Sequence, residues 1–353
     1  MKYRLLICLL FVALPWPCAR AYGQSGRNSR QDESGKPTGT KIKPVPPPPL
    51  QGGVPDKPQK PDKTDDTLRI NSDLVTLVAT VSAMPGVPPQ PFNQEDFEVY
   101  EDGVKQDIAD FARTADAPLR MVMLFDTSSS IAPRIGFERR AAMRFFERVM
   151  RPQDQAALIS FSDEIQLLQG FTGQVPQLTK ATKLLRPKGA TSLYDAIYLG
   201  AGLVAPAKGR HVIIVVSDGG DTTSAKTLRE ALNAAQNADA VIYAVFTGSN
   251  STSLNIQDLA AIRALESMTA ETGGELYRPR ISADATDEQI DNQSMRELDG
   301  VFERLAAQLS TQYLLGYYPG NENRDGKFRK LDVRVKRQGY AVRARSGYYA
   351  PKS

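Results

Sequence analysis

Two stretches of the chain are continuous runs of apolar residues, and each run leads into an aspartate. Residues 121–125, MVMLF, precede Asp126, and residues 211–217, HVIIVVS, precede Asp218. A strand that is apolar at nearly every position is typical of a parallel sheet that helices cover on both faces. These runs therefore predict two interior strands of an α/β fold.

The segments around these runs alternate between strand and helix patterns. Further strands are expected over 155–163 and 240–248, and the segment 164–172 is a candidate neighbour of the first of these. Helical spacing of apolar residues indicates helices over 135–150, 175–185, 191–205, 225–239, 258–274 and 294–312. The alternation predicts an α/β fold with a doubly wound, mostly parallel sheet.

The segments on either side of this region have the pattern of antiparallel strands. Every second residue from Val75 to Val81 is apolar, and residues 97–113 indicate two strands joined by an Asp-Gly turn. Residues 328–337 and 340–349 alternate in the same way, after a strand-like stretch that begins at Tyr313. We expect the two flanking segments to pair into one small unit resembling a β-sandwich.

The N-terminus has the pattern of a secretory signal peptide. A basic MKYR precedes about a dozen apolar residues and then ARA, with Ala19 and Ala21 at the small-residue positions. A membrane span needs roughly 20 apolar residues, so a retained anchor is an alternative, as is a lipidated Cys18. We expect residues 1–21 to be removed and the protein to be exported to the periplasm, the cell envelope or the extracellular space, without stable membrane insertion.

The Pro-rich stretch that follows predicts a linker, so the expected organisation has five parts. These are the signal peptide 1–21, the linker 22–66, an N-terminal β segment 67–117, the α/β domain 118–280, and a helix with a C-terminal β segment 281–353. Both cysteines, Cys8 and Cys18, lie in the leader. Removing its three basic residues reduces the net charge from +4 to +1 (4 − 3), which gives no electrostatic case for binding nucleic acid.

Oxygen-bearing side chains gather where the two apolar strands end. Asp126, Ser128 and Ser130 follow the first strand, Asp218 follows the second, and Thr191 lies in a loop just before a helix. Ligands of open parallel sheets bind beyond the carboxyl ends of the strands. Carboxylates and hydroxyls are hard donors that suit Mg²⁺ or Mn²⁺. An Asp-x-Ser-x-Ser motif by itself is also compatible with an ordinary helix cap.

This set of residues resembles the metal-ion-dependent adhesion site of the von Willebrand factor type A domain. The family pattern of Asp-x-Ser-x-Ser, a loop Thr and a later Asp falls on Asp126, Ser128, Ser130, Thr191 and Asp218. The resemblance covers roughly Pro118 to Pro279. It implies direct ligation by both serines, aspartates that act partly through waters, and Thr191 direct or water-bridged. The flanking segments resemble an acidobacterial subfamily of type A-related proteins.

The resemblance implies a protein partner that supplies an Asp or Glu oxygen to the metal. Asp195 and Asp221 are candidates for supporting the metal shell, with helix-start and capping roles as the alternatives. We expect no enzyme, because a serine triad needs a base and the one histidine, His211, begins a strand at the opposite end of the sheet. The other candidate functions are an assembly factor of an envelope complex and a metal-assisted hydrolase.

Overall fold

The computed structural model describes residues 74–114, 117–248, 256–280 and 292–352. The predicted signal peptide and Pro-rich linker lie outside these residues. Within the described ranges, no helix is long and apolar enough to cross a membrane.

The α/β part is built on a six-stranded sheet with the order β10-β9-β8-β5-β6-β7. Neighbouring strands run parallel, except that β7 is antiparallel to β6. The predicted mostly parallel sheet is thereby confirmed. The strands are β5 (Leu119–Asp126), β6 (Gln155–Phe161), β7 (Ile165–Thr172), β8 (Arg210–Ser217), β9 (Ala240–Phe246) and β10 (Leu276–Tyr277).

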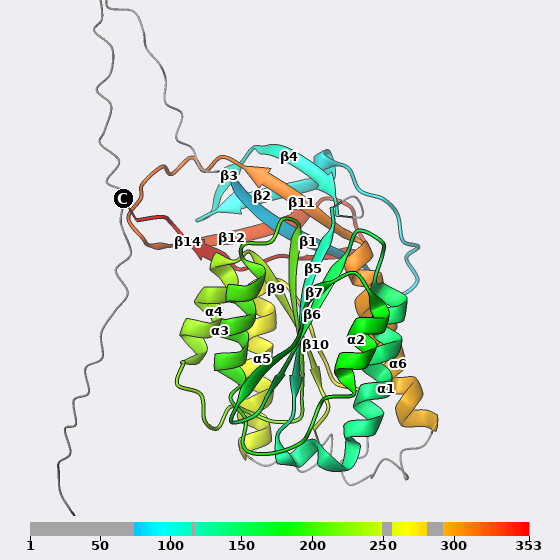
Figure 1. Cartoon of the computed structure of the whole chain (residues 1–353). Helices are drawn as coiled ribbons and strands as arrows, with labels where there is room; N and C mark the ends of the chain where they lie inside the picture. The colour runs from blue at the N-terminus through cyan, green and yellow to red at the C-terminus, as the bar shows by residue number, and fades with distance from the viewer. Residues whose placement is uncertain (1–73, 115–116, 249–255, 281–291, 353) are drawn as a thin grey trace, which may run out of the picture. The chain divides into compact units, whose positions relative to one another are not determined.

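Helices cover both faces of this sheet (Figure 1). One face carries α1 (Ile135–Val149), α2 (Val175–Thr182) and α6 (Asn292–Ser310), and the other carries α3 (Leu193–Val204), α4 (Leu228–Asn237) and α5 (Ile256–Thr272). The central strand β5 serves both layers. Met121, Met123 and Phe125 pack in the first layer, while Val122 and Leu124 pack in the second. Its unbroken apolar run is the consequence of burial on two faces.

The flanking segments form two four-stranded antiparallel sheets, as predicted. The sheet orders are β13-β1-β11-β4 and β14-β12-β2-β3. Each sheet combines strands from before and after the α/β part. The strands are β1 (Val75–Ala83), β2 (Phe97–Glu101), β3 (Val104–Gln106), β4 (Ile108–Arg113), β11 (Gln312–Tyr317), β12 (Phe328–Val335), β13 (Tyr340–Arg343) and β14 (Gly347–Tyr349).

Side chains from both sheets share one apolar core. Leu77 of β1 and Leu315 of β11 belong to the same buried cluster as Val99 of β2 and Leu331 of β12. Burying one such side chain contributes about 1.5–3 kcal/mol. Because every second residue of these strands is apolar, the apolar side chains of four separate segments lie in one interior. This shared core supports the predicted sandwich-like unit.

The Asp-Gly hairpin also forms where the sequence predicts it. Strands β2 and β3 pair with Glu101 opposite Val104. The two turn residues between them, Asp102 and Gly103, have φ values of 49° and 85°. Two consecutive positive φ angles are what a two-residue turn of this kind requires, and Asp and Gly tolerate them.

A buried polar joint links the sandwich-like unit to the α/β part. Helix α6 and strand β11 are separated only by Thr311. The first residue of β11, Gln312, accepts a hydrogen bond from Arg210 Nη1 at 2.6 Å. Its amide nitrogen donates to the Tyr243 hydroxyl at 2.7 Å and to Thr80 Oγ1 at 3.2 Å. One side chain thus contacts β1, β8 and β9 together.

Candidate metal site

The predicted site residues meet at the carboxyl ends of β5 and β8. These strands are parallel neighbours, with Phe125 opposite Val216. Asp126 is the last residue of β5, and Asp218 directly follows β8. The backbone after β5 is held to the next strand, because the N–H of Thr127 donates to the carbonyl of Phe161 at 2.7 Å. Strand pairing therefore delivers both aspartates to one edge of the sheet.

The Asp126 carboxylate is fully buried and accepts two hydrogen bonds. Oδ1 accepts the backbone N–H of Ser128 at 2.8 Å, and Oδ2 accepts the Ser217 hydroxyl at 2.5 Å. Burial raises the pKa of Asp126 to about 6, although both donors oppose this shift. The two donors fix the orientation of the carboxylate relative to the serines.

The remaining polar groups form a continuous chain. The hydroxyls of Ser128 and Ser130 are 2.9 Å apart, and Ser130 donates to Asp218 Oδ1 at 2.9 Å. Thr191, Ser130 and Asp218 line one cavity with a volume of about 530 Å³. Thr191 lies in the loop before α3, and Thr222 holds this loop in place. The N–H of Thr191 donates to the Thr222 hydroxyl, and the carbonyl of Thr191 accepts the N–H of Thr222. All five predicted residues therefore lie at one site.

The two predicted supporting aspartates make other contacts. The Asp195 oxygens accept the backbone N–H groups of Ala225 and Lys226 at 2.9 and 2.8 Å. Asp221 lines the cavity and accepts the N–H of Tyr194 at 3.3 Å. Both side chains shape the loops around the cavity, and their support of a metal shell stays a prediction.

Sequence analysis missed three residues at this site. Ser217 contacts Asp126, and Arg134 Nη2 lies 2.7 Å from Asp218 Oδ2 in an ion pair with both side chains at least nine-tenths buried. Glu138 is fully buried nearby, with its Oε1 4.0 Å from Arg134 Nε. Ser217 immediately precedes Asp218, so its proximity was readable. Arg134 and Glu138 are four residues apart, a spacing that places side chains on one helix face.

The electrostatics of Glu138 are unusual for a glutamate. Neither carboxylate oxygen has a hydrogen-bond partner among the described residues. Burial raises the pKa of Glu138 to about 8, even though the charge of Arg134 acts in the opposite direction. The neutral carboxyl is therefore the dominant form at neutral pH when Arg134 contacts Asp218.

The donor set fits a hard divalent cation. Two carboxylates and three hydroxyls at one cavity are the donors that Mg²⁺ or Mn²⁺ prefers. Within the described ranges, no three His, Cys, Asp or Glu residues cluster closely enough to hold a metal by themselves. Among the described residues of the site, the Arg134 guanidinium is the group whose charge opposes a cation.

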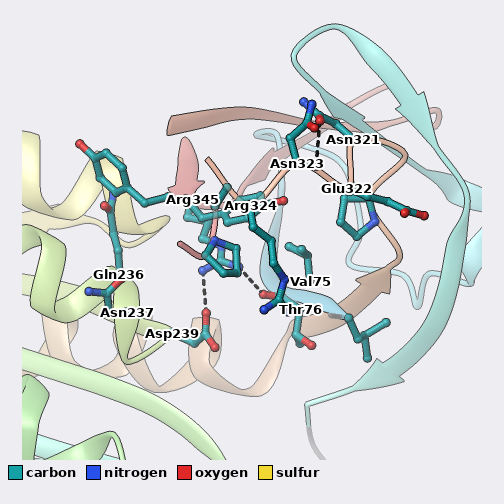
Figure 2. A pocket seen from close by; sticks show the side chains of 16 residues that line it. Val75, Thr76, Gln236, Asn237, Asp239, Asn321, Glu322, Asn323, Arg324 and Arg345 are labelled. Carbon is teal, nitrogen blue, oxygen red and sulfur yellow. Dashed lines mark hydrogen bonds and ion pairs between the residues drawn. The ribbon is translucent and has the colours of Figure 1, made fainter. Parts of the chain in front are cut away.

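A further pocket, of about 240 Å³, lies beside the start of β9 (Figure 2). Arg345 crosses this region, donating to Asp239 at 2.6 Å and to the Thr76 carbonyl at 2.7 Å. Asp239 immediately precedes β9, so this pocket is at the amino end of that strand. None of the predicted metal-site residues lines it.

Gly248 lies against the backbone of Asp218, with no room for a side chain. A Cβ atom at this position would lie 2.5 Å from the backbone oxygen of Asp218 and 2.5 Å from Phe246 Cζ. We expect Gly248→Ala to displace Asp218, to cost about 1–3 kcal/mol of stability, and to weaken Mg²⁺ binding about tenfold or more. Titration calorimetry and urea unfolding measure both effects. Gly219→Ala is the control, because open space surrounds that position; equal effects of the two variants would contradict the prediction.

Residues 121–221 match the family model of the von Willebrand factor type A domain. No curated protein matches the chain. Solved structures with a similar fold include the PilB minor pilin from Streptococcus sanguinis, which is 12% identical with a TM-score of 0.43 over 55% of this chain and 62% of that chain. BatB from Bacteroides thetaiotaomicron is 14% identical with a TM-score of 0.41 over 54% and 98% of the two chains.

A third similar structure is proximal thread matrix protein 1 from the mussel byssus. It is 17% identical with a TM-score of 0.40 over 58% of this chain and 48% of that chain. The match therefore spans less than two thirds of the PilB pilin and of the byssus protein. These identities and scores carry no argument about function. The family match itself includes all five predicted site residues.

Proposed function

We propose that this chain is an exported, non-enzymatic binding module. A divalent cation, Mg²⁺ or Mn²⁺, is held by Asp126, Ser128, Ser130, Thr191 and Asp218, and it takes a carboxylate oxygen from an Asp or Glu side chain of a protein partner. The observation that carries the proposal is the chain of contacts from Asp126 through both serines to Asp218, of which Ser130 and Asp218 line one cavity.

The chain's own residues have distinct tasks in this proposal. Asp126 and Asp218 supply the negative charge that balances a divalent cation, while the hydroxyls add donors without adding charge. Ser217 and the Ser128 N–H hold Asp126 in orientation. When bound, the cation supplies a positive centre for a partner carboxylate. Ser130, Thr191 and Asp218 line the cavity through which that carboxylate approaches.

The contacts of His211 support a non-enzymatic function. Its ring nitrogens lie 2.6 and 2.7 Å from the carbonyl oxygens of Ala238 and Ala207. The residue lies near the start of β8, whereas Asp126 ends the neighbouring parallel strand. A metal-assisted hydrolase needs a general base near Asp126. The described site offers only carboxylates for that role, so turnover lost in an Asp126 variant would be needed to favour this alternative.

Export, the linker and the flanking segments complete the proposal. The leader 1–21 directs export, and residues 22–66 tether the folded part at the periplasm, envelope or exterior. The narrower likeness to acidobacterial type A-related proteins rests on the flanking segments. The buried joint at Gln312 favours one alternative, an assembly factor in which the sandwich-like unit and the α/β domain act as one body.

Calorimetric titration of Mg²⁺ and Mn²⁺ into the chelated protein tests the metal site. We expect saturable one-site binding in the wild type and none in Asp126→Ala or Asp126→Asn. The Asn variant keeps the shape of the side chain, and circular dichroism checks that both variants remain folded. A partner captured in Mg²⁺ should be released by EDTA. A partner that stays bound in EDTA would favour the assembly alternative instead.

A further inference from the structure

Arg134 pairs with Asp218, a carboxylate for which a bound cation would compete. It ends a short helical stretch, Ser129–Arg134, that begins within the Asp-x-Ser-x-Ser motif. Its Nη2 contacts Asp218 Oδ2 at 2.7 Å, and the two side chains are only 5% and 7% exposed. At this depth the attraction is weakly screened by solvent. A positive charge of the chain therefore already neutralises one of the two carboxylates proposed to face the metal.

Glu138 is a second carboxylate within reach of the same guanidinium. It lies one helical turn after Arg134, in the first turn of α1, and its side chain is fully buried. Its Oε1 is 4.0 Å from Arg134 Nε, which is too long for a hydrogen bond. Neither of its oxygens has a hydrogen-bond partner among the described residues. A buried carboxylate whose paired guanidinium nitrogen is as far as 4.0 Å is poorly compensated, so this position favours a closer approach of the cationic group.

We propose that Arg134 is an internal competitor for the cation: it pairs with Asp218 in the metal-free protein and transfers to Glu138 when a divalent cation binds. This inference rests on the proposed function of the site. It assigns Arg134 the role of lowering cation affinity and Glu138 the role of relieving that effect, whereas an Arg134 that merely orients Asp218 would raise cation affinity.

Charge balance explains why the exchange needs Glu138. A divalent cation is neutralised by Asp126 and Asp218 together, and its positive charge would repel the buried Arg134 guanidinium. Moving the guanidinium to Glu138, with release of the Glu138 proton, pairs the positive charge with a carboxylate and separates it from the metal. The two carboxylates face two nitrogens of one guanidinium, Asp218 at Nη2 and Glu138 at Nε. The transfer therefore requires only a side-chain rearrangement.

The test is a double-variant cycle measured by Mg²⁺ and Mn²⁺ calorimetry on the chelated exported protein. Arg134→Gln should bind Mg²⁺ about tenfold or more tightly than the wild type, because a like charge leaves the site. Glu138→Gln should bind more weakly, because Arg134 loses its alternative partner. The double variant should bind like Arg134→Gln alone. Arg144→Gln is the matched control, since Arg144 is on α1 like Glu138 and its exposed ion pair is with Asp299 of α6.

A second measurement follows the metal-free protein. Thermal unfolding in EDTA should show a lower melting temperature for Arg134→Gln, because Asp218 loses its buried partner, and a larger rise on adding Mg²⁺. Weaker Mg²⁺ binding by Arg134→Gln would overturn the competitor role but leave the metal site standing. Additive effects of the two substitutions would overturn the exchange with Glu138. No binding by any folded variant, wild type included, would overturn this inference and the proposed function together.

Discussion

Glu138→Gln is expected to flatten the pH dependence of stability of the metal-free protein. Burial raises the pKa of Glu138 from 4.5 to about 8, so the folded protein retains a proton that the unfolded chain releases. The contribution of protonated Glu138 to the free energy of unfolding is fully present below about pH 4.5 and is lost as the pH rises to about 8. At about 1.4 kcal/mol per pKa unit, the wild type should lose roughly 3–5 kcal/mol across this range.

The charged groups around Glu138 have opposing effects on its protonation. Arg134 favours the ionised form, and Asp218 and Asp126 favour the neutral form. The Asp126 pKa is also raised, to about 6, so the variant should keep part of the slope. Urea unfolding in EDTA at pH 5, 6.5 and 8 measures the difference. Glu303→Gln, which alters an exposed ion pair with Arg148, is the control. A Glu138→Gln slope equal to that of the wild type would refute the prediction.

Gln312→Leu is expected to destabilise the protein by about 3–5 kcal/mol. The substitution removes an acceptor from the buried Arg210 guanidinium and a donor from the buried Tyr243 hydroxyl. A charged group that loses a buried partner is among the costlier single changes. Burial already lowers the pKa of Arg210 to about 10, which shows how strongly this environment disfavours its charge. One remaining hydrogen bond links Arg210 Nη1 to the Leu309 carbonyl.

Urea unfolding of Gln312→Leu beside Gln308→Leu measures this effect. Gln308 lies near the end of α6, the helix that precedes Gln312, and its amide donates to the partly exposed Glu275, so its replacement should cost less. We also expect Gln312→Leu to uncouple the sandwich-like unit from the α/β part, visible as separate unfolding transitions. Equal costs for the two variants would mean that the buried joint contributes no more than an ordinary surface hydrogen bond.

Much of the fold was readable because burial on two faces leaves a clear pattern. The unbroken run from Met121 to Phe125 predicted an interior parallel strand, and each of its residues is buried in one helical layer or the other. The place where such a strand ends is also visible in sequence. Because parallel neighbours end at the same edge, Asp126 and Asp218 were expected to meet, and the pairing of β5 with β8 brings them together.

Long-range side-chain direction decided what local pattern could not. Nothing in the stretch after Ser130 indicates that Arg134 turns toward Asp218, 84 residues away, and not toward solvent. Arg134 ends the short helical stretch Ser129–Arg134, and this stretch sets the direction of its side chain. Similarly, Gln312 looks like an ordinary polar residue at a helix end, yet the antiparallel pairing of β1 with β11 buries it against β8 and β9.

The sequence by itself determined which strands are buried on both faces and which flanking strands alternate. It also determined which oxygen-bearing side chains follow the ends of the buried strands. Each of these depends on apolar periodicity or on the end of a strand, which are local properties. Only the tertiary structure decided that a guanidinium pairs with Asp218, that a buried glutamate lies beside this guanidinium, and that one glutamine joins the two parts. These depend on side chains distant in sequence meeting in a low-dielectric interior, where a single buried charge outweighs the local pattern.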